Sequence, residues 1–68
     1  MKTIGMIAEI CKNARVRAGN TQKFVAGFAG CSTSAISKFE QGKRNNAEIF
    51  LVYLLLYPYI KEELENGL

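Results

Sequence analysis

The sequence predicts a single all-α domain built from five short helices. The chain has 68 residues, which is enough for one small domain. Its hydrophobic content of 49% argues for a packed core and against disorder. Apolar residues recur at three- and four-residue spacing, and capping residues and glycines divide them into five segments. We therefore treat residues 1–68 as one domain.

The first helix is expected from Ile4 to Ala18. Gly19 ends it, because glycine readily adopts the left-handed conformation that side chains resist. Arg15 and Arg17 lie near its end, where basic groups interact favourably with the negative pole of the helix dipole. They are also candidates for contacts to a polyanion. The expected apolar stripe consists of Ile7, Ile10, Cys11 and Ala14.

The next stretch predicts two short helices joined by a tight turn. Thr21 caps a helix over residues 22–29, Gly30 lies at the bend, and Ser32 caps a helix over residues 33–41. This is the layout of a helix-turn-helix, whose second helix enters the major groove of DNA. The buried side chains expected here are Phe24, Val25, Phe28 and Ala29 in the first helix, and Ile36 and Phe39 in the second.

A fourth helix is expected to run to Tyr57. Asn45 and Glu48 fit a capping box at its start. The run Ile49–Tyr57 is apolar on every side, and its leucines favour a helix over a strand. A one-sided helix would bury Phe50, Tyr53, Leu54 and Tyr57. The remaining apolar residues, Ile49, Val52, Leu55 and Leu56, then predict an oligomer or partner interface.

A fifth, acidic helix is expected from Pro58 to Glu65, since proline suits a first helical turn. The charge of the chain is uneven. Residues 1–46 hold eight basic and two acidic side chains, whereas residues 47–68 hold one basic and four acidic ones. This imbalance indicates that the first part faces a polyanion, although an ordinary solvated surface is the alternative.

Several classes of function are not expected. The chain has no histidine and only two cysteines, Cys11 and Cys31, which we expect to be small buried thiols. No metal-ligand spacing, cofactor loop or catalytic constellation is present, so we expect no enzyme, cofactor or small-molecule substrate. We see no signal peptide, and the apolar run is shorter than the ~20 residues of a bilayer span. The expectation is a cytoplasmic protein without membrane contact.

The central residues resemble a known family. Gln22, Val25, Ala26, Gly30, Ile36 and Phe39 match the helix-turn-helix of phage Cro and repressor N-terminal domains, within the XRE-like group. The pattern TQxxVAxxxGxSxSxISxFExGKR spans Thr21 to Arg44. This resemblance implies a lambda-repressor-like five-helix domain that usually binds operators as a dimer. Its departures are the missing proline after Arg44 and the aliphatic surface of the helix that follows.

The resemblance also implies site residues. Gln22 would contact a phosphate and buttress the recognition helix, and the loop after this helix would touch the DNA backbone. Lys23 is added to the expected phosphate contacts because its side chain is positively charged. The groove-facing residues would be Ser32, Thr33, Ser34, Ser37 and Lys38, and the phosphate contacts would be Gln22, Lys23, Lys43, Arg44 and Asn45.

Two functional hypotheses follow. The first is a transcriptional regulator of a temperate-phage lysis–lysogeny switch that binds operator DNA as a dimer or heteromer, in the bacterial host. Serine and threonine discriminate bases weakly, and Lys38 either reads guanine or holds a phosphate. The second is an anti-repressor that binds the phage repressor itself. The chain resembles such modulator-of-repressor (MOR-type) proteins in its length, weak recognition face and apolar fourth helix.

Overall fold

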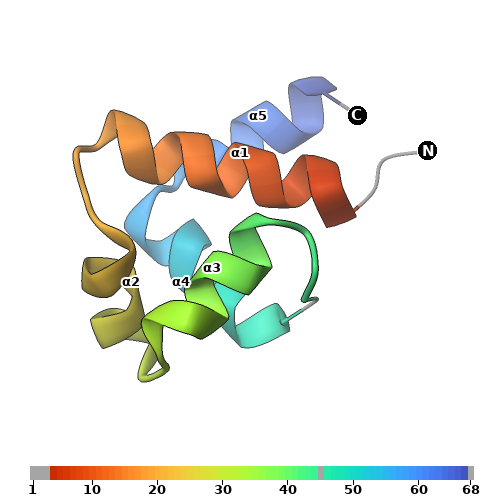
Figure 1. Ribbon diagram of the computed structural model, residues 1–68. Coiled ribbons are helices and arrows are strands. Elements are labelled where there is room, and N and C mark those ends of the chain that lie inside the picture. Colours follow the sequence, from red (N-terminus) through yellow and green to blue (C-terminus); the bar gives the residue numbers. More distant parts are fainter. Residues whose placement is uncertain (1–3, 45, 68) are drawn as a thin grey trace.

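The computed structural model describes residues 4–44 and 46–67, which form five α-helices and no strand (Figure 1). The predicted all-α fold with a central helix-turn-helix is confirmed, and no helix end differs from expectation by more than two residues. The most extensive helix contacts close a ring from α1 through α3, α2, α4 and α5 back to α1. The helices are α1 (Ile4–Arg17), α2 (Gln22–Ala29), α3 (Thr33–Glu40), α4 (Ala47–Leu56) and α5 (Tyr59–Gly67).

The helix-turn-helix is set by local contacts. The Thr21 hydroxyl accepts a hydrogen bond from the Phe24 N–H at 3.0 Å, and the Ser32 hydroxyl accepts one from the Ala35 N–H at 3.1 Å. These contacts satisfy N–H groups that the helix itself leaves unpaired. Between the helices, Gly30 adopts a φ of 70°, in the left-handed region that favours glycine. The predicted caps and bend are therefore confirmed.

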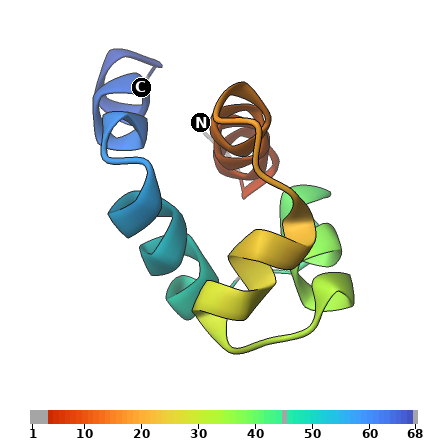
Figure 2. The same ribbon diagram turned by 90° about the vertical axis from the view of Figure 1, so that its left-hand side faces the viewer.

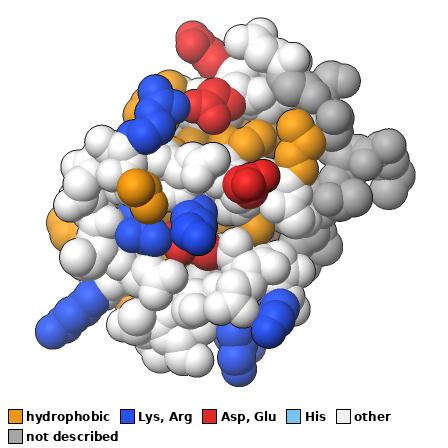
Figure 3. Space-filling view, turned by 45° about the horizontal axis from the view of Figure 1, so that its top comes forward, with side chains coloured by type: hydrophobic (Ala, Val, Ile, Leu, Met, Phe, Trp, Pro, Cys, Tyr) orange, Lys and Arg blue, Asp and Glu red, His pale blue; other side chains and the backbone are white. Residues whose placement is uncertain are grey.

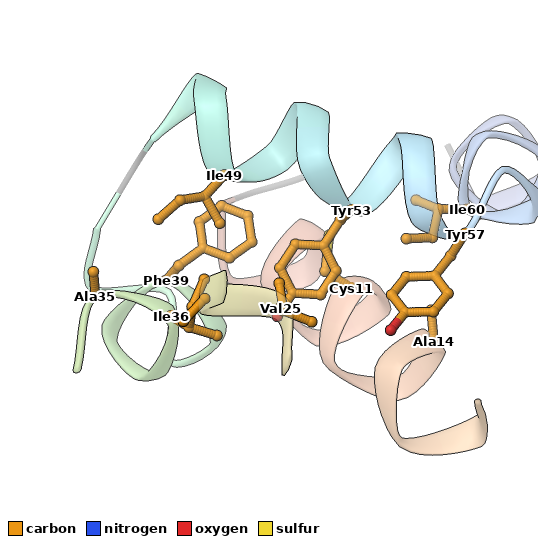
Figure 4. Packing of buried hydrophobic residues seen from close by; sticks show 11 residues of the cluster. Cys11, Ala14, Val25, Ala35, Ile36, Phe39, Ile49, Tyr53, Tyr57 and Ile60 are labelled. Atoms are coloured by element: carbon orange, nitrogen blue, oxygen red, sulfur yellow. The ribbon is translucent and has the colours of Figure 1, made fainter. Parts of the chain in front are cut away.

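Every helix supplies a fully buried side chain to one core (Figure 4). The ring of Tyr53 stacks on that of Phe39, with centroids 5.5 Å apart. In Figure 2, α4 and α5 lie on one side of this core and α1 and α3 on the other, with α2 across the lower end. The largest fully buried residues are Cys11 of α1, Val25 of α2, Ile36 of α3, Tyr53 of α4 and Ile60 of α5.

The expected inner face of α2 is partly wrong. Val25 is buried and Ala29 half-buried, but Phe24 is 43% exposed and Phe28 63% exposed. The two phenylalanines precede Val25 and Ala29 by one residue, and one residue turns a helix by about 100°. Their spacing suits a core face equally well, but that face is already formed by Val25, Ala26 and Ala29. The two rings pack on each other instead, with their centroids 5.1 Å apart.

The expected surface of α4 also needs correction. Ile49 is only 2% exposed and belongs to the core, so it is not available to a partner. Val52 and Leu56 are half-buried and pack against the core. The exposed leucines of α4 are Leu55, which was expected, and Leu51, which was not, at 72% and 55% exposure.

The physical reason is that α4 is apolar all round, so its sequence does not reveal which face turns inward. The helix also begins at a different cap, because the Asn46 side chain accepts the hydrogen bond from the Ile49 N–H at 3.1 Å. The capping box predicted from Asn45 and Glu48 is therefore wrong, and Asn45 itself lies outside the described residues.

The acidic helix α5 is tied to the end of α1. Arg17 forms an ion pair with Glu63 at 2.9 Å, and its guanidinium lies 5.3 Å from the ring centroid of Tyr59. The Tyr59 hydroxyl donates to the Ala14 carbonyl at 3.1 Å. Across the described ranges, no helix has both the length and the hydropathy to cross a membrane.

Candidate nucleic-acid interface

Helix α3 has a sharply divided surface. Ala35, Ile36 and Phe39 are buried in the core. The opposite side carries the predicted groove-facing residues. Three hydroxyl side chains at the start of the helix are exposed, and Lys38 is exposed one turn further on. Of this set, Ser32, Thr33, Ser34, Ser37 and Lys38, only Ser37 is half-buried, and it accepts a hydrogen bond from Gln41 Nε2 at 3.1 Å.

The predicted phosphate contacts flank this surface. Lys23 on α2 is exposed, as are Lys43 and Arg44 directly after α3. Asn45 lies outside the described residues. Figure 3 views the molecule from the side of α1 and α5, and the charged side chains at its lower edge, toward α2 and α3, are basic. The structure thus places α3 hydroxyls and basic groups from two segments on neighbouring surfaces.

The basic loop is held close to the helix that it follows. The Lys43 N–H donates to the Lys38 carbonyl at 3.0 Å, which continues the end of α3. Gly42 has a φ of 77°, and a Cβ at this position would lie 3.1 Å from the Cα of Gly5. Glycine is favoured here, because a side chain would strain this φ and press on the backbone of α1. The position of Lys43 and Arg44 relative to α3 is therefore determined by the fold.

Behind the interface lies a buried carboxylate that the sequence did not reveal. Glu40, at the end of α3, is only 7% exposed. It accepts hydrogen bonds from Arg15 Nε at 2.7 Å and Arg15 Nη2 at 3.0 Å, and from Gln22 Nε2 at 3.0 Å. The Tyr53 hydroxyl donates to it as well. One carboxylate therefore joins α1, α2, α3 and α4.

Contacts within the fold involve three of the residues that were candidates for contact with a polyanion. Arg15 is held by Glu40 and by the Asn20 carbonyl at 2.9 Å, so its guanidinium is directed into the fold. Arg17 pairs with Glu63 on the far side of α1. Gln22 does buttress α3, as expected, through its bond to Glu40. The exposed basic residues on and beside the helix-turn-helix are thus Lys23, Lys38, Lys43 and Arg44.

The network is charged in the folded protein. Burial alone would raise the pKa of the Glu40 carboxyl, but hydrogen bonds from Arg15, Tyr53 and Gln22 outweigh it and the pKa is lowered. The hydrogen bond to Glu40 in turn raises the pKa of Arg15. Burial is the main cause that raises the pKa of Tyr53, and burial also raises that of the Cys11 thiol, to about 12. Glu40 and Arg15 therefore face each other as ions.

We expect the protein to lose stability in acid. The carboxyl pKa of Glu40 is lowered in the folded state from its ordinary 4.5, so the unfolded chain binds the proton more tightly. The stability that this difference in pKa contributes is fully present above the unfolded-state pKa. It is lost as the pH falls through the lower folded-state pKa. Urea denaturation from neutral pH into acid measures it. The Glu40→Gln variant should show a flatter dependence, and an unchanged dependence would contradict the assignment.

One further surface feature is a shallow pocket on α2, lined by Lys23, Phe24, Gly27 and Phe28.

Within the described part of the chain, no group of three histidine, cysteine or acidic side chains is placed to hold a metal ion. Both cysteines in this part are free thiols, Cys11 buried and Cys31 half-buried. Comparison of the chain with protein-family models, curated proteins and solved structures found no match.

Proposed function

We propose that this chain is a small helix-turn-helix transcriptional regulator that binds operator DNA through α3. Its setting would be the lysis–lysogeny switch of a temperate phage, in the cytoplasm of the bacterial host. The observation that carries the proposal is the exposed polar face of α3, flanked by Lys23, Lys43 and Arg44. The likeness of residues 21–44 to Cro and repressor domains supports the phage setting.

The contacts divide by role. The first turn of α3 enters the major groove, where the hydroxyls of Thr33 and Ser34 contact base edges. Lys43 and Arg44 neutralise phosphates beside the groove and set the register. Short hydroxyls discriminate bases less than bidentate Arg, Asn or Gln do. A single copy therefore discriminates poorly between DNA sequences, and function requires a dimer or a heteromer with the phage repressor.

Salt dependence provides the test of the phosphate contacts. The logarithm of the binding constant for a DNA duplex should fall linearly with the logarithm of the salt concentration, since each neutralised phosphate releases counterions. Arg44→Ala and Lys43→Ala should each weaken binding to all sequences and lower the slope by about 1. Lys61→Ala, which changes an exposed lysine on α5, is the matched control and should leave the slope unchanged. Equal slopes for all three variants and the parent chain would contradict these contacts.

A second candidate is favoured by the exposed aromatic side chains of α2. Phe24 and Phe28 lie on the first helix of the helix-turn-helix, and large exposed apolar groups mark partner sites. In this case the chain is an anti-repressor that binds the phage repressor and masks its DNA-binding surface. Co-expression with an adjacently encoded repressor, followed by gel shift with each protein alone and both together, separates the two. A tight complex with no duplex binding by the isolated chain favours the anti-repressor.

A further inference from the structure

The outer face of α4 carries exposed leucines. Leu51 and Leu55 lie one helical turn apart and are 55% and 72% exposed. Half-buried Val52 and Leu54 lie beside them on the helix. We refer to these four residues as the α4 outer face. Side chains at this spacing suit the side of a second helix, because helices pack through rows of residues three and four apart.

An acidic side chain continues the α4 outer face toward the start of the helix. Glu48 is exposed, and it precedes Leu51 by three residues and Leu55 by seven, so the three side chains lie along one stripe of α4. Among the residues that the structure describes, Glu48 has no cation within ion-pair distance. A partner that covers the two leucines therefore meets an unpaired carboxylate at this end.

The helix that follows adds negative charge on the same side of the core. In Figure 2, α5 lies beyond the end of α4 on this side, and its Glu62 and Glu65 are exposed. Glu63 is already paired with Arg17. Residues 47–68 hold four acidic side chains and one basic one. This side of the molecule therefore favours a basic partner over DNA or a second copy of the chain, either of which would bring like charges together.

We propose that the α4 outer face binds a basic amphipathic helix of another protein. The apolar stripe of that helix packs on Leu51 and Leu55. Basic residues toward its two ends pair with Glu48 of α4 and with Glu62 of α5. This mode of recognition, in which an amphipathic helix lays its apolar side on an apolar surface, needs anchors at the three- and four-residue spacing that α4 presents.

The consequence is a chain with two separate binding surfaces. The polar face of α3 lies across the core from α4 and α5 (Figure 2), so a helix bound to α4 leaves α3 accessible. The chain then links a second protein to DNA. This last step alone rests on the proposed function, because binding of the helix to α4 involves none of the residues assigned to DNA contacts.

The experiment uses two labelled synthetic helices as probes and the full chain, without DNA. Both helices have the same length and the same leucines at three- and four-residue spacing. One carries lysines beside this stripe, and the other carries glutamates at the same positions. Fluorescence anisotropy should show that the basic helix binds and that the acidic helix binds at least about tenfold more weakly.

Variants of the chain locate the binding surface, with circular dichroism to confirm that each is folded. Leu55→Ser should weaken binding of the basic helix at least about tenfold. The double variant Glu48→Gln with Glu62→Gln should weaken it at least about twofold at low salt, and less at high salt. Val16→Ser and Glu9→Gln are the matched controls, because they change an exposed apolar residue and an exposed carboxylate on α1 and should leave binding unchanged.

Three results would overturn the proposal. The first is a basic helix that does not bind, or that binds no more tightly than the acidic one. The second is binding that Phe28→Ser abolishes and Leu55→Ser leaves intact, which would place the surface on α2. The third is a parent chain that dimerises in sedimentation equilibrium and a Leu55→Ser variant that does not, which would show that a second copy covers α4.

A separate duplex titration distinguishes this proposal from the proposed function. A chain that binds the basic helix but no duplex would support the α4 surface and contradict DNA binding. A chain that binds duplex but not the basic helix would contradict the α4 surface alone.

Discussion

The Glu40→Gln variant is expected to lose about 3–5 kcal/mol of folding free energy, because it leaves a buried charge without its partner. Glutamine keeps the size of the side chain and part of its hydrogen bonding. It removes the negative charge that faces Arg15, whose side chain is only 11% exposed. The Tyr53 hydroxyl and the Gln22 amide also lose a charged acceptor, and hydrogen bonds to charged groups are the stronger kind.

This loss is large for so small a chain. At the usual ~0.05–0.15 kcal/mol per residue, 68 residues have a total stability of roughly 3–10 kcal/mol. Each lost kcal/mol lowers the Tm of such a domain by about 4–8 °C. Thermal and urea denaturation followed by circular dichroism measure the change. We expect Glu40→Gln to be largely unfolded at temperatures where the parent chain is folded.

Two controls test whether the loss of folding free energy comes from the unpaired charge of Arg15. Glu62→Gln removes a carboxylate that is exposed, and it should change stability by no more than about 0.5 kcal/mol. The double variant Arg15→Met with Glu40→Gln removes both ions and should recover part of the loss. A loss below about 1 kcal/mol in Glu40→Gln would mean that the network does not stabilise the fold.

The features that were predictable from the sequence are those set by neighbouring residues. Thr21 and Ser32 cap their helices through N–H groups three residues away, and Gly30 supplies a backbone conformation that side chains resist. These contacts need no knowledge of the rest of the fold. The exposure of Thr33 and Ser34 followed in the same way, because Ile36 and Phe39 fix the opposite face of α3.

The features that were missed depend on tertiary packing. In α2, Phe24 and Phe28 have the same four-residue spacing as Val25 and Ala29, and only the position of α4 and α3 decides which pair is buried. In α4 every side is apolar, so the sequence could not show that Ile49 faces the core. Both corrections concern the rotation of a helix about its own axis.

The buried network was missed for a related reason. In the sequence, Glu40 counted only toward the charge balance of residues 1–46, although it follows Ile36 by four residues and Phe39 by one, at the edge of the buried face of α3. Arg15 similarly follows buried Ala14. Their pairing links residues 25 positions apart, and nothing in the local sequence indicates such a contact.

The Ser34→Glu variant is expected to lose DNA binding while keeping its fold. Ser34 is exposed in the first turn of α3, where a negative side chain interacts favourably with the helix dipole. The substitution should therefore not lower the stability of the fold. In a DNA complex the same carboxylate would face the phosphate-lined groove. Like charges brought together at an interface cost several kcal/mol, which corresponds to binding weakened at least about a hundredfold.

Asn13→Glu is the matched control for this variant. Asn13 is an exposed polar residue on α1, so the substitution changes the net charge of the chain by the same amount at a different place. Any loss of affinity that follows from net charge alone will appear equally in both variants. The difference between them isolates the contribution of the α3 surface.

The most direct test of DNA binding through α3 is the fluorescence anisotropy of a labelled mixed-sequence duplex at low salt. It is measured with the parent chain, Ser34→Glu and Asn13→Glu. The account predicts that the parent chain and Asn13→Glu bind the duplex with similar affinity and that Ser34→Glu binds at least about a hundredfold more weakly. A parent chain that does not bind the duplex, or a Ser34→Glu variant that binds as well as Asn13→Glu, would contradict it.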